Sequence, residues 1–196
     1  MKRTGFLLLL ALGMLASMAA DAQSMRLRGT ITDVQGNILS VKSREGENLT
    51  LHMPDKVGVS VAKAIKFEDI KKGDYVGATT MKQADGSMVA VEVHYLPPVV
   101  PQGQLPWDLQ PGSTMTNANV TASVASTGKR ELTLEFKGRS QKIIVPESAA
   151  LVRAVRGSRA DLKPGEFIFA IVSKGADGKL LAPRIQVSKD GVRPPQ

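Results

Sequence analysis

Residues 69–75 read Asp69-Ile70-Lys71-Lys72-Gly73-Asp74-Tyr75, and residues 161–167 read Asp161-Leu162-Lys163-Pro164-Gly165-Glu166-Phe167. The two stretches lie 92 residues apart, and the same offset relates the turn Asp85-Gly86 to Asp177-Gly178. Upstream, Leu39 and Val41 align with Leu132 and Leu134 after a one-residue slip, as expected where a hairpin turn changes length. Self-similarity at a fixed period is the signature of repeated structural units. The chain is therefore predicted to contain two copies of one unit.

Within each unit, apolar residues alternate with polar ones between turn residues, which is typical of β-strands. In the first unit we expect strands near 27–34, 38–43, 48–53, 57–61, 74–81 and 87–95. A helical turn is expected within 62–71, ending at Gly73, where a positive φ is useful. Five or six short strands with one helical insertion predict a closed or partly closed barrel of the OB type, because closure removes exposed sheet edges. A two-sheet sandwich is the alternative.

The expected fold class is therefore all-β with minor helix: two tandem small OB-like β-barrels joined by a Pro-rich connector. The expected boundaries are a first barrel over 23–97, the connector over 98–117 and a second barrel over 118–196. Each unit carries a full strand set, so each is expected to fold by itself. The only Trp, Trp107, lies in the connector between prolines, where we expect it to wedge between the two barrels rather than stack on a ligand.

The N-terminal segment 1–22 has the features of a secretory signal peptide. Lys2 and Arg3 precede an apolar run over 6–15, and Ala20-Asp21-Ala22 has the small-residue form that signal peptidase accepts. We expect cleavage after Ala22; an uncleaved anchor is the alternative. No later stretch is long enough to span a bilayer, so a periplasmic or secreted protein without a transmembrane span in the mature chain is predicted. Because cysteine is absent, burial rather than disulfides must stabilise it.

The motif D-[IL]-K-x-G-[DE] before a strand, the D-G hairpin after it and the connector sequence resemble a family of secreted proteobacterial proteins with a domain of unknown function. The specific part is the connector stretch Pro106-Trp107-Asp108-Leu109-Gln110-Pro111-Gly112-Ser113-Thr114-Met115-Thr116-Asn117. The resemblance covers most of the mature chain. It implies an exported protein of tandem small barrels, with no assigned activity or site residues.

No catalytic residue set is recognisable, so a non-enzymatic protein is expected. Nucleophilic catalysis by cysteine is excluded by composition, and only His52 and His94 could serve as the imidazole base of a serine triad. No nucleophile elbow, Walker loop or zinc-protease helix motif occurs. Asp74 and Glu166 occupy equivalent turn positions, where bonding to backbone groups is their simplest role. No cofactor is expected.

Four residues suggest a metal site as an alternative hypothesis. Glu92 and His94 are two residues apart on an expected strand and so project from the same face, which Met88 is expected to share. His52 lies on another strand, and imidazole with thioether would suit copper better than zinc. The second unit has Arg184 and Gln186 at the positions of Glu92 and His94. The alternative is an exposed strand face of mixed polar residues.

The positive charge is unevenly divided between the two units. Residues 23–117 carry ten Lys or Arg and ten Asp or Glu, whereas residues 118–196 carry fourteen and seven. Arg153, Arg156 and Arg159 form a three-spaced set where the first unit has Val61, Ala64 and Phe67. A basic patch of this kind indicates an anionic partner, the alternative being a solvated, solubilising surface.

Export favours polyanions of the envelope over intracellular nucleic acid as partners. Nucleic acid is further disfavoured because no ladder of exposed aromatics is recognisable for base stacking. The sequence therefore predicts an exported, non-enzymatic binding or assembly module. Its partner would be an anionic glycan, a lipid head group or an envelope protein, and a periplasmic copper- or zinc-handling accessory protein is the alternative function.

Overall fold

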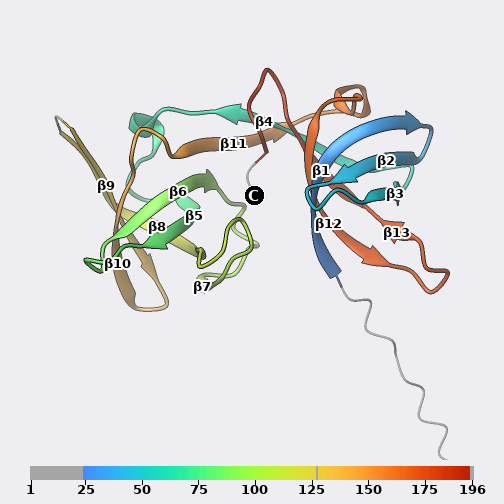
Figure 1. Cartoon of the computed structure of the whole chain (residues 1–196). Helices are drawn as coiled ribbons and strands as arrows, with labels where there is room; N and C mark the ends of the chain where they lie inside the picture. Colours follow the sequence, from blue (N-terminus) through green and yellow to red (C-terminus); the bar gives the residue numbers. More distant parts are fainter. Residues whose placement is uncertain (1–23, 127, 195–196) are drawn as a thin grey trace, which may run out of the picture.

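The computed structural model describes residues 24–126 and 128–194, which form fourteen strands and two short 3₁₀ helices (Figure 1). The all-β prediction is therefore confirmed. The expected signal peptide over 1–22 and the expected mature N-terminus at Gln23 lie outside the described residues. Within the described part of the chain, no helix is long and apolar enough to cross a membrane.

The first barrel is a closed ring of five strands drawn from both ends of the chain. Antiparallel pairing joins β1 (Ser24–Gln35) to β2 (Ile38–Ser43), and β2 to β3 (Asn48–His52). β3 pairs in parallel with β13 (Leu180–Leu181), which pairs with β12 (Phe167–Lys174). β12 then pairs with β1 and closes the ring. In Figure 1 this barrel contains both the blue and the orange-red ends of the chain.

The second barrel repeats this arrangement with strands from the middle of the chain. β8 (Thr114–Ser126), β9 (Lys129–Phe136) and β10 (Arg139–Ile144) form an antiparallel meander. β10 contacts β6 (Met88–Tyr95) in parallel, and β6 pairs with β5 (Tyr75–Lys82). β5 pairs with β8, so this ring also closes.

The barrels do not follow the predicted boundaries over 23–97 and 118–196. The first barrel takes β1, β2 and β3 from the first unit and β12 and β13 from the second. The second barrel takes β8, β9 and β10 from the second unit and β5 and β6 from the first. The units have therefore exchanged strands within one chain. The prediction that each unit closes its own barrel is wrong, because alternation within a strand indicates which face is buried but not which strand lies beside it.

Two strands cross between the barrels and pair with each other. β4 (Gly58–Ala64) is antiparallel to β11 (Ala150–Arg156), and Figure 1 shows both spanning the two lobes. At the middle of this bridge Ala62 faces Ala154, and these two residues are equivalent in the sequence repeat. Equivalent residues that face each other mark a pseudo-twofold axis. β14 (Arg184–Val187) and β6 flank the bridge in parallel, which makes one continuous sheet across both barrels.

The repeated seven-residue motif connects each unit to the other by backbone hydrogen bonds, at the point where the strands are exchanged. After each 3₁₀ helix, η1 (Phe67–Asp69) or η2 (Arg159–Asp161), a glycine turns the chain with a φ near 90°. The Gly73 amide donates to the Val120 carbonyl, and the Gly165 amide donates to the Ile31 carbonyl. Each motif therefore docks on the long first strand of the other unit, at a β-bulge.

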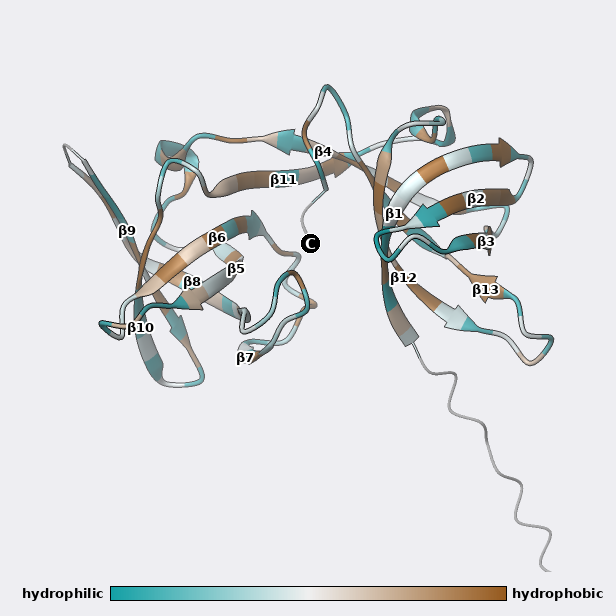
Figure 2. Cartoon of the chain, in the orientation of Figure 1, coloured by the Kyte–Doolittle hydropathy of each residue, from teal (hydrophilic) through white to brown (hydrophobic). Residues whose placement is uncertain are grey.

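Each barrel has its own apolar core, and Figure 2 shows hydrophobic residues, in brown, along the strands of both barrels. The first core combines residues from both units: Leu27, Ile31, Leu39, Val41, Leu51, Ile168, Val172 and Ile185. The second does likewise: Phe67, Val76, Val93, Val120, Leu132, Leu134, Phe136 and Ile143. Burying apolar surface stabilises a fold by about 25 cal/mol per Å². In both barrels this stabilisation therefore depends on side chains from both sequence units.

The connector is a hairpin rather than a free linker. β7 (Gly103–Pro106) pairs with the start of β8, so the first strand of the second unit begins at Thr114 and not at 118. Residues 107–113 form the hairpin loop, which hydrogen bonds from the Trp107 and Ser113 backbone amides close. The Ser113 hydroxyl also donates to the Trp107 carbonyl at 3.0 Å. We call residues 107–110 of this loop the connector tip.

Candidate functional site

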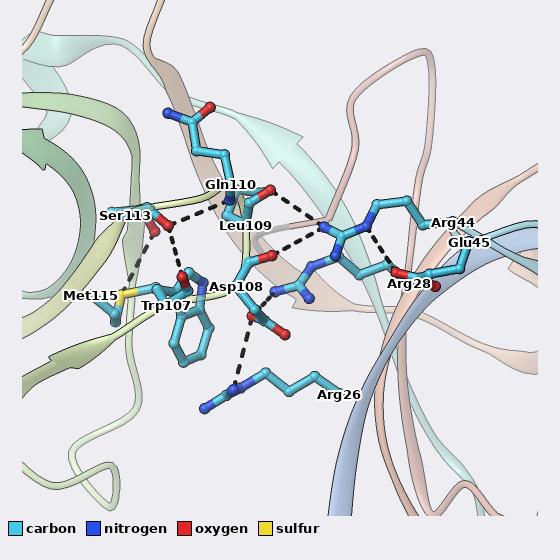
Figure 3. A network of polar contacts seen from close by, with 11 residues as sticks. Arg26, Arg28, Arg44, Glu45, Trp107, Asp108, Leu109, Gln110, Ser113 and Met115 are labelled. Carbon is cyan, nitrogen blue, oxygen red and sulfur yellow. Dashed lines mark hydrogen bonds and ion pairs between the residues drawn. The ribbon is translucent and has the colours of Figure 1, made fainter.

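The connector tip reaches the first barrel at three arginines, which we call the arginine site: Arg26, Arg28 and Arg44 (Figure 3). Arg26 and Arg28 lie two apart on β1 and so point from the same face of the strand, outside the barrel core. Arg44 lies in the turn between β2 and β3. The site therefore combines a strand face with a neighbouring turn of the first barrel.

Asp108 is the acidic group at the centre of the site. Its Oδ1 accepts a hydrogen bond from Arg28 Nη2 at 2.9 Å and lies 3.8 Å from Arg26 Nη1. The Arg28 side chain is 2% exposed, whereas that of Asp108 is 45% exposed. Partial burial would raise the pKa of Asp108, but the hydrogen bond from Arg28 and the charges of Arg28 and Arg26 outweigh it and lower the pKa below its ordinary value.

The backbone and indole of the tip complete the contact. Arg44 Nη1 donates to the carbonyls of Asp108 and Leu109 at 3.2 and 3.3 Å. The Arg26 guanidinium lies 4.0 Å from the centroid of the Trp107 ring, within the range of a cation–π interaction. Trp107 therefore bridges the two barrels, as predicted, by stacking on an arginine of the first.

The Arg28 guanidinium also lies over the Phe169 ring, and its Nε donor makes no hydrogen bond within the described residues. Its guanidinium carbon lies 5.1 Å from the Phe169 ring centroid, and Phe169 is its cross-strand neighbour on β12. Gln186 follows Phe169 on β14 in the same row. Among the described residues, neither Arg28 Nε nor Gln186 Oε1 has a hydrogen-bond partner, although both atoms are buried. A buried donor and a buried acceptor are thus left beside the site.

The three arginines predicted from the sequence are not brought together. Arg153 and Arg156 are three apart on β11 and project from opposite faces, because successive strand residues alternate. Arg153 stacks 4.2 Å from the Tyr95 ring centroid, and Arg159 donates to Asn37 Oδ1 at 2.6 Å. A spacing of three makes a cluster on a helix but not on a strand.

Two of these arginines support the fold. Tyr95 donates a hydrogen bond to Asp74 Oδ2 at 2.7 Å, and burial together with this bond raises the Tyr95 pKa, which the stacked Arg153 partly opposes. Asp74 also accepts from the Lys71 amide at 2.7 Å, as its predicted structural role requires. Arg159, through Asn37 and the Pro54 carbonyl, fastens η2 to the first barrel.

The predicted metal ligands are divided between the barrels. His52 lies on β3 of the first barrel, whereas Met88, Glu92 and His94 lie on β6 of the second. A bulge in the β5–β6 pairing shifts the faces of β6, so Met88 packs against the core and does not share the face of Glu92. In the part of the chain that the structure describes, no group of three or more His, Cys, Asp or Glu could hold a metal ion.

Glu92 and His94 do share a face, as predicted, and they contact each other. His94 Nδ1 lies 2.7 Å from Glu92 Oε1, and both residues are buried. They face Thr79 and Gly77 across β5. With His52 on the other barrel and Met88 on the opposite face of β6, the pair is separated from the other predicted ligands.

The excess positive charge is distributed differently between the two folded barrels than between the two sequence units. The first barrel with β4, residues 24–64 and 157–194, carries thirteen Lys or Arg and eight Asp or Glu. The rest, residues 65–156, carries eleven and nine. The excess therefore belongs mainly to one barrel rather than to the second sequence unit. Sequence reasoning missed the arginine site because its members lie in the first unit, whose charges cancel.

A scan of protein-family models finds no match to this chain, and a search of curated proteins finds no significant relative.

Proposed function

We propose that the protein is an exported, non-enzymatic binding or assembly module of the cell envelope that holds an anionic group at the arginine site. The signal-peptide features of residues 1–22 support a periplasmic or secreted location. Membership of the secreted proteobacterial family of unknown function, suggested by the connector and the repeated motif, belongs to the same proposal.

An OB-type assignment of both barrels is part of the proposal. In each ring the first three strands form a meander, the third contacts the fifth in parallel, and the fourth returns to the first. Each ring is thus a five-stranded barrel with a 3₁₀ turn before its fourth strand. OB-type barrels use their outer strand face and adjacent loops to bind extended ligands such as oligosaccharides and oligonucleotides.

The single observation that carries the function is the convergence of three guanidinium groups on the connector tip, two of them at the Asp108 carboxylate and the third at its backbone carbonyls. Arg26 and Arg44 are 35% and 42% exposed, so solvent and ligands reach them. Arg28 is buried, and its Nε lacks a partner among the described residues. Planar guanidinium groups are suited to carboxylate and phosphate groups, and a site with surplus arginine attracts anions.

The test is retention on heparin, a soluble polyanion, as a function of salt. The double variant Arg26→Gln/Arg44→Gln should elute at lower salt than wild type, because fewer ion pairs form and they are screened at the surface. The matched control, Arg153→Gln/Arg159→Gln, also removes two positive charges, but from outside the site. Equal shifts for the two variants would mean that retention follows net charge alone and would refute the arginine site.

A further inference from the structure

The arginine site is occupied by a piece of polypeptide. Three consecutive residues of the connector tip supply its contacts: the indole of Trp107, the carboxylate of Asp108, and the carbonyls of Asp108 and Leu109. Arg44 donates hydrogen bonds to the backbone, Arg28 pairs with the acidic side chain, and Arg26 stacks on the aromatic ring (Figure 3). Each arginine therefore contacts a different part of one short peptide.

The contact made within the chain is incomplete. Arg28 gives Asp108 only Nη2, while its buried Nε has no partner among the described residues. The preferred pairing of a guanidinium with a carboxylate is bidentate, with two parallel hydrogen bonds. Arg26 approaches the same carboxylate oxygen only to 3.8 Å. A peptide free of the hairpin could turn its carboxylate to meet both Arg28 donors.

The tip can leave the site without opening either barrel. It is the loop of the β7–β8 hairpin, it belongs to neither core cluster, and its internal bonds to Ser113 do not involve the first barrel. Its contacts with the first barrel include the arginine contacts described above. Departure would leave Arg28 without its carboxylate partner, a place that the carboxylate of another segment could take.

Resting on the proposed function, we infer that the arginine site recognises an acidic segment of a partner protein that carries an aromatic residue next to Asp or Glu. The connector tip occupies this site in cis and is displaced when the partner segment binds. Because a tethered segment acts at an effective concentration near the millimolar range, it competes with the partner and lowers the apparent affinity of wild type.

The test uses a capped peptide with the sequence of residues 105–112, Leu-Pro-Trp-Asp-Leu-Gln-Pro-Gly, as the probe. The full-length variant Trp107→Ala/Asp108→Ala empties the tip, and a fluorescent label on the peptide reports binding to this variant and to wild type alike by anisotropy. We expect this variant to bind the peptide at least about ten-fold more tightly than wild type, whose tip competes. Adding Arg28→Met to the variant should abolish binding.

The control peptide carries Asn in place of Asp and should bind at least about ten-fold more weakly, because it lacks the charge that Arg28 pairs with. Equal binding of the two peptides, or equal binding of one peptide by wild type and the emptied variant, would overturn the inference. Circular dichroism and thermal unfolding establish that the emptied variant is folded, and Asp108→Ala alone replaces it if it is not.

Heparin retention of the emptied variant separates this inference from the proposed function. Retention that still depends on Arg26 and Arg44, without peptide binding, would leave the anion-binding function standing and reject the peptide as its ligand. Loss of both retention and peptide binding in a folded variant would reject both. Binding of the peptide together with retention supports both.

Discussion

Arg28 carries a charge that its surroundings only partly compensate. Its guanidinium is almost fully removed from solvent, beside the Phe169 ring, and its only ion-pair partner among the described residues is the half-exposed Asp108. A guanidinium stays protonated throughout the accessible pH range, so it cannot relieve the cost of burial by losing its proton. The ion pair between Arg28 and Asp108 is therefore one of the contacts that hold the connector tip against the first barrel.

The two partners should respond unequally to substitution. Asp108→Asn leaves Arg28 buried without a counter-charge and should lower the free energy of unfolding by about 1–2 kcal/mol, less than for a fully buried pair because solvent reaches Asp108. Arg28→Met removes the buried charge itself and should change stability by less than about 1 kcal/mol. Urea unfolding followed by circular dichroism measures both, and a larger loss for Arg28→Met would contradict this explanation.

The contact should also resist acid. The pKa of Asp108 is lowered in the folded protein, so its stabilising contribution is complete above the unfolded value of about 3.9 and disappears only as pH falls through the lower folded value. Trp107, the only tryptophan, reports this release by its fluorescence. Asp108→Asn should show no such transition. A wild-type midpoint above 4 would show that another carboxyl group controls the tip, such as that of Glu45, whose Oε1 accepts a hydrogen bond from Arg44 Nε at 3.2 Å.

At the scale of elements, the pairing of β5 with β6 leaves no room for a side chain at one position of β5, Gly77. Gly77 on β5 faces His94 on β6, and a Cβ at Gly77 would lie 2.8 Å from His94 Nε2. The ring is held in place by Glu92, so it cannot swing away without losing a buried hydrogen bond. The buried His94–Glu92 pair therefore requires glycine at position 77.

Gly77→Ala should lower the free energy of unfolding by about 1–3 kcal/mol, the usual cost of overpacking. Gly58→Ala is the matched control, because there a Cβ would meet the flexible Arg184 side chain at 3.3 Å. Thermal unfolding measures both variants. If both lose the same amount, the cost comes from replacing glycine in a strand and not from His94.

The strands themselves were largely predictable, and their partners were not. Alternation located β2, β3 and β5 to within one or two residues, and the repeated motif located the 3₁₀ turns. The bulge that turns Met88 away from Glu92 depends on pairing with β5 and leaves no mark within β6 itself. Likewise, the arginine site depends on the connector hairpin reaching β1, a contact across 80 residues between Arg28 and Asp108.

At the scale of the whole molecule, neither sequence unit contains a complete barrel. Fragments 23–97 and 98–196 each lack two strands of one ring and three of the other. Kept apart at low micromolar concentration, each fragment should lack a cooperative thermal transition, because its core positions remain exposed. Mixed in equal amounts, they should recover the circular dichroism spectrum of the intact protein as a one-to-one complex.

Size-exclusion chromatography with light scattering gives the stoichiometry of the mixture. Two monomeric fragments that each melt cooperatively would show that the units can close their own barrels, and the exchanged arrangement would then be one of two accessible folds. Recovery on mixing would show that the strand exchange is required.

The pseudo-twofold axis between Ala62 and Ala154 has a consequence for ancestry. A single unit with these pairings would be a protomer of a strand-exchanged homodimer, and its folding would depend on how often two molecules meet. Duplication and fusion of such a gene places both protomers on one polypeptide. Unfolding of the present chain should then be independent of its concentration, and the two former protomers are free to diverge, so that one carries the arginine site and the connector between them supplies the loop that contacts it.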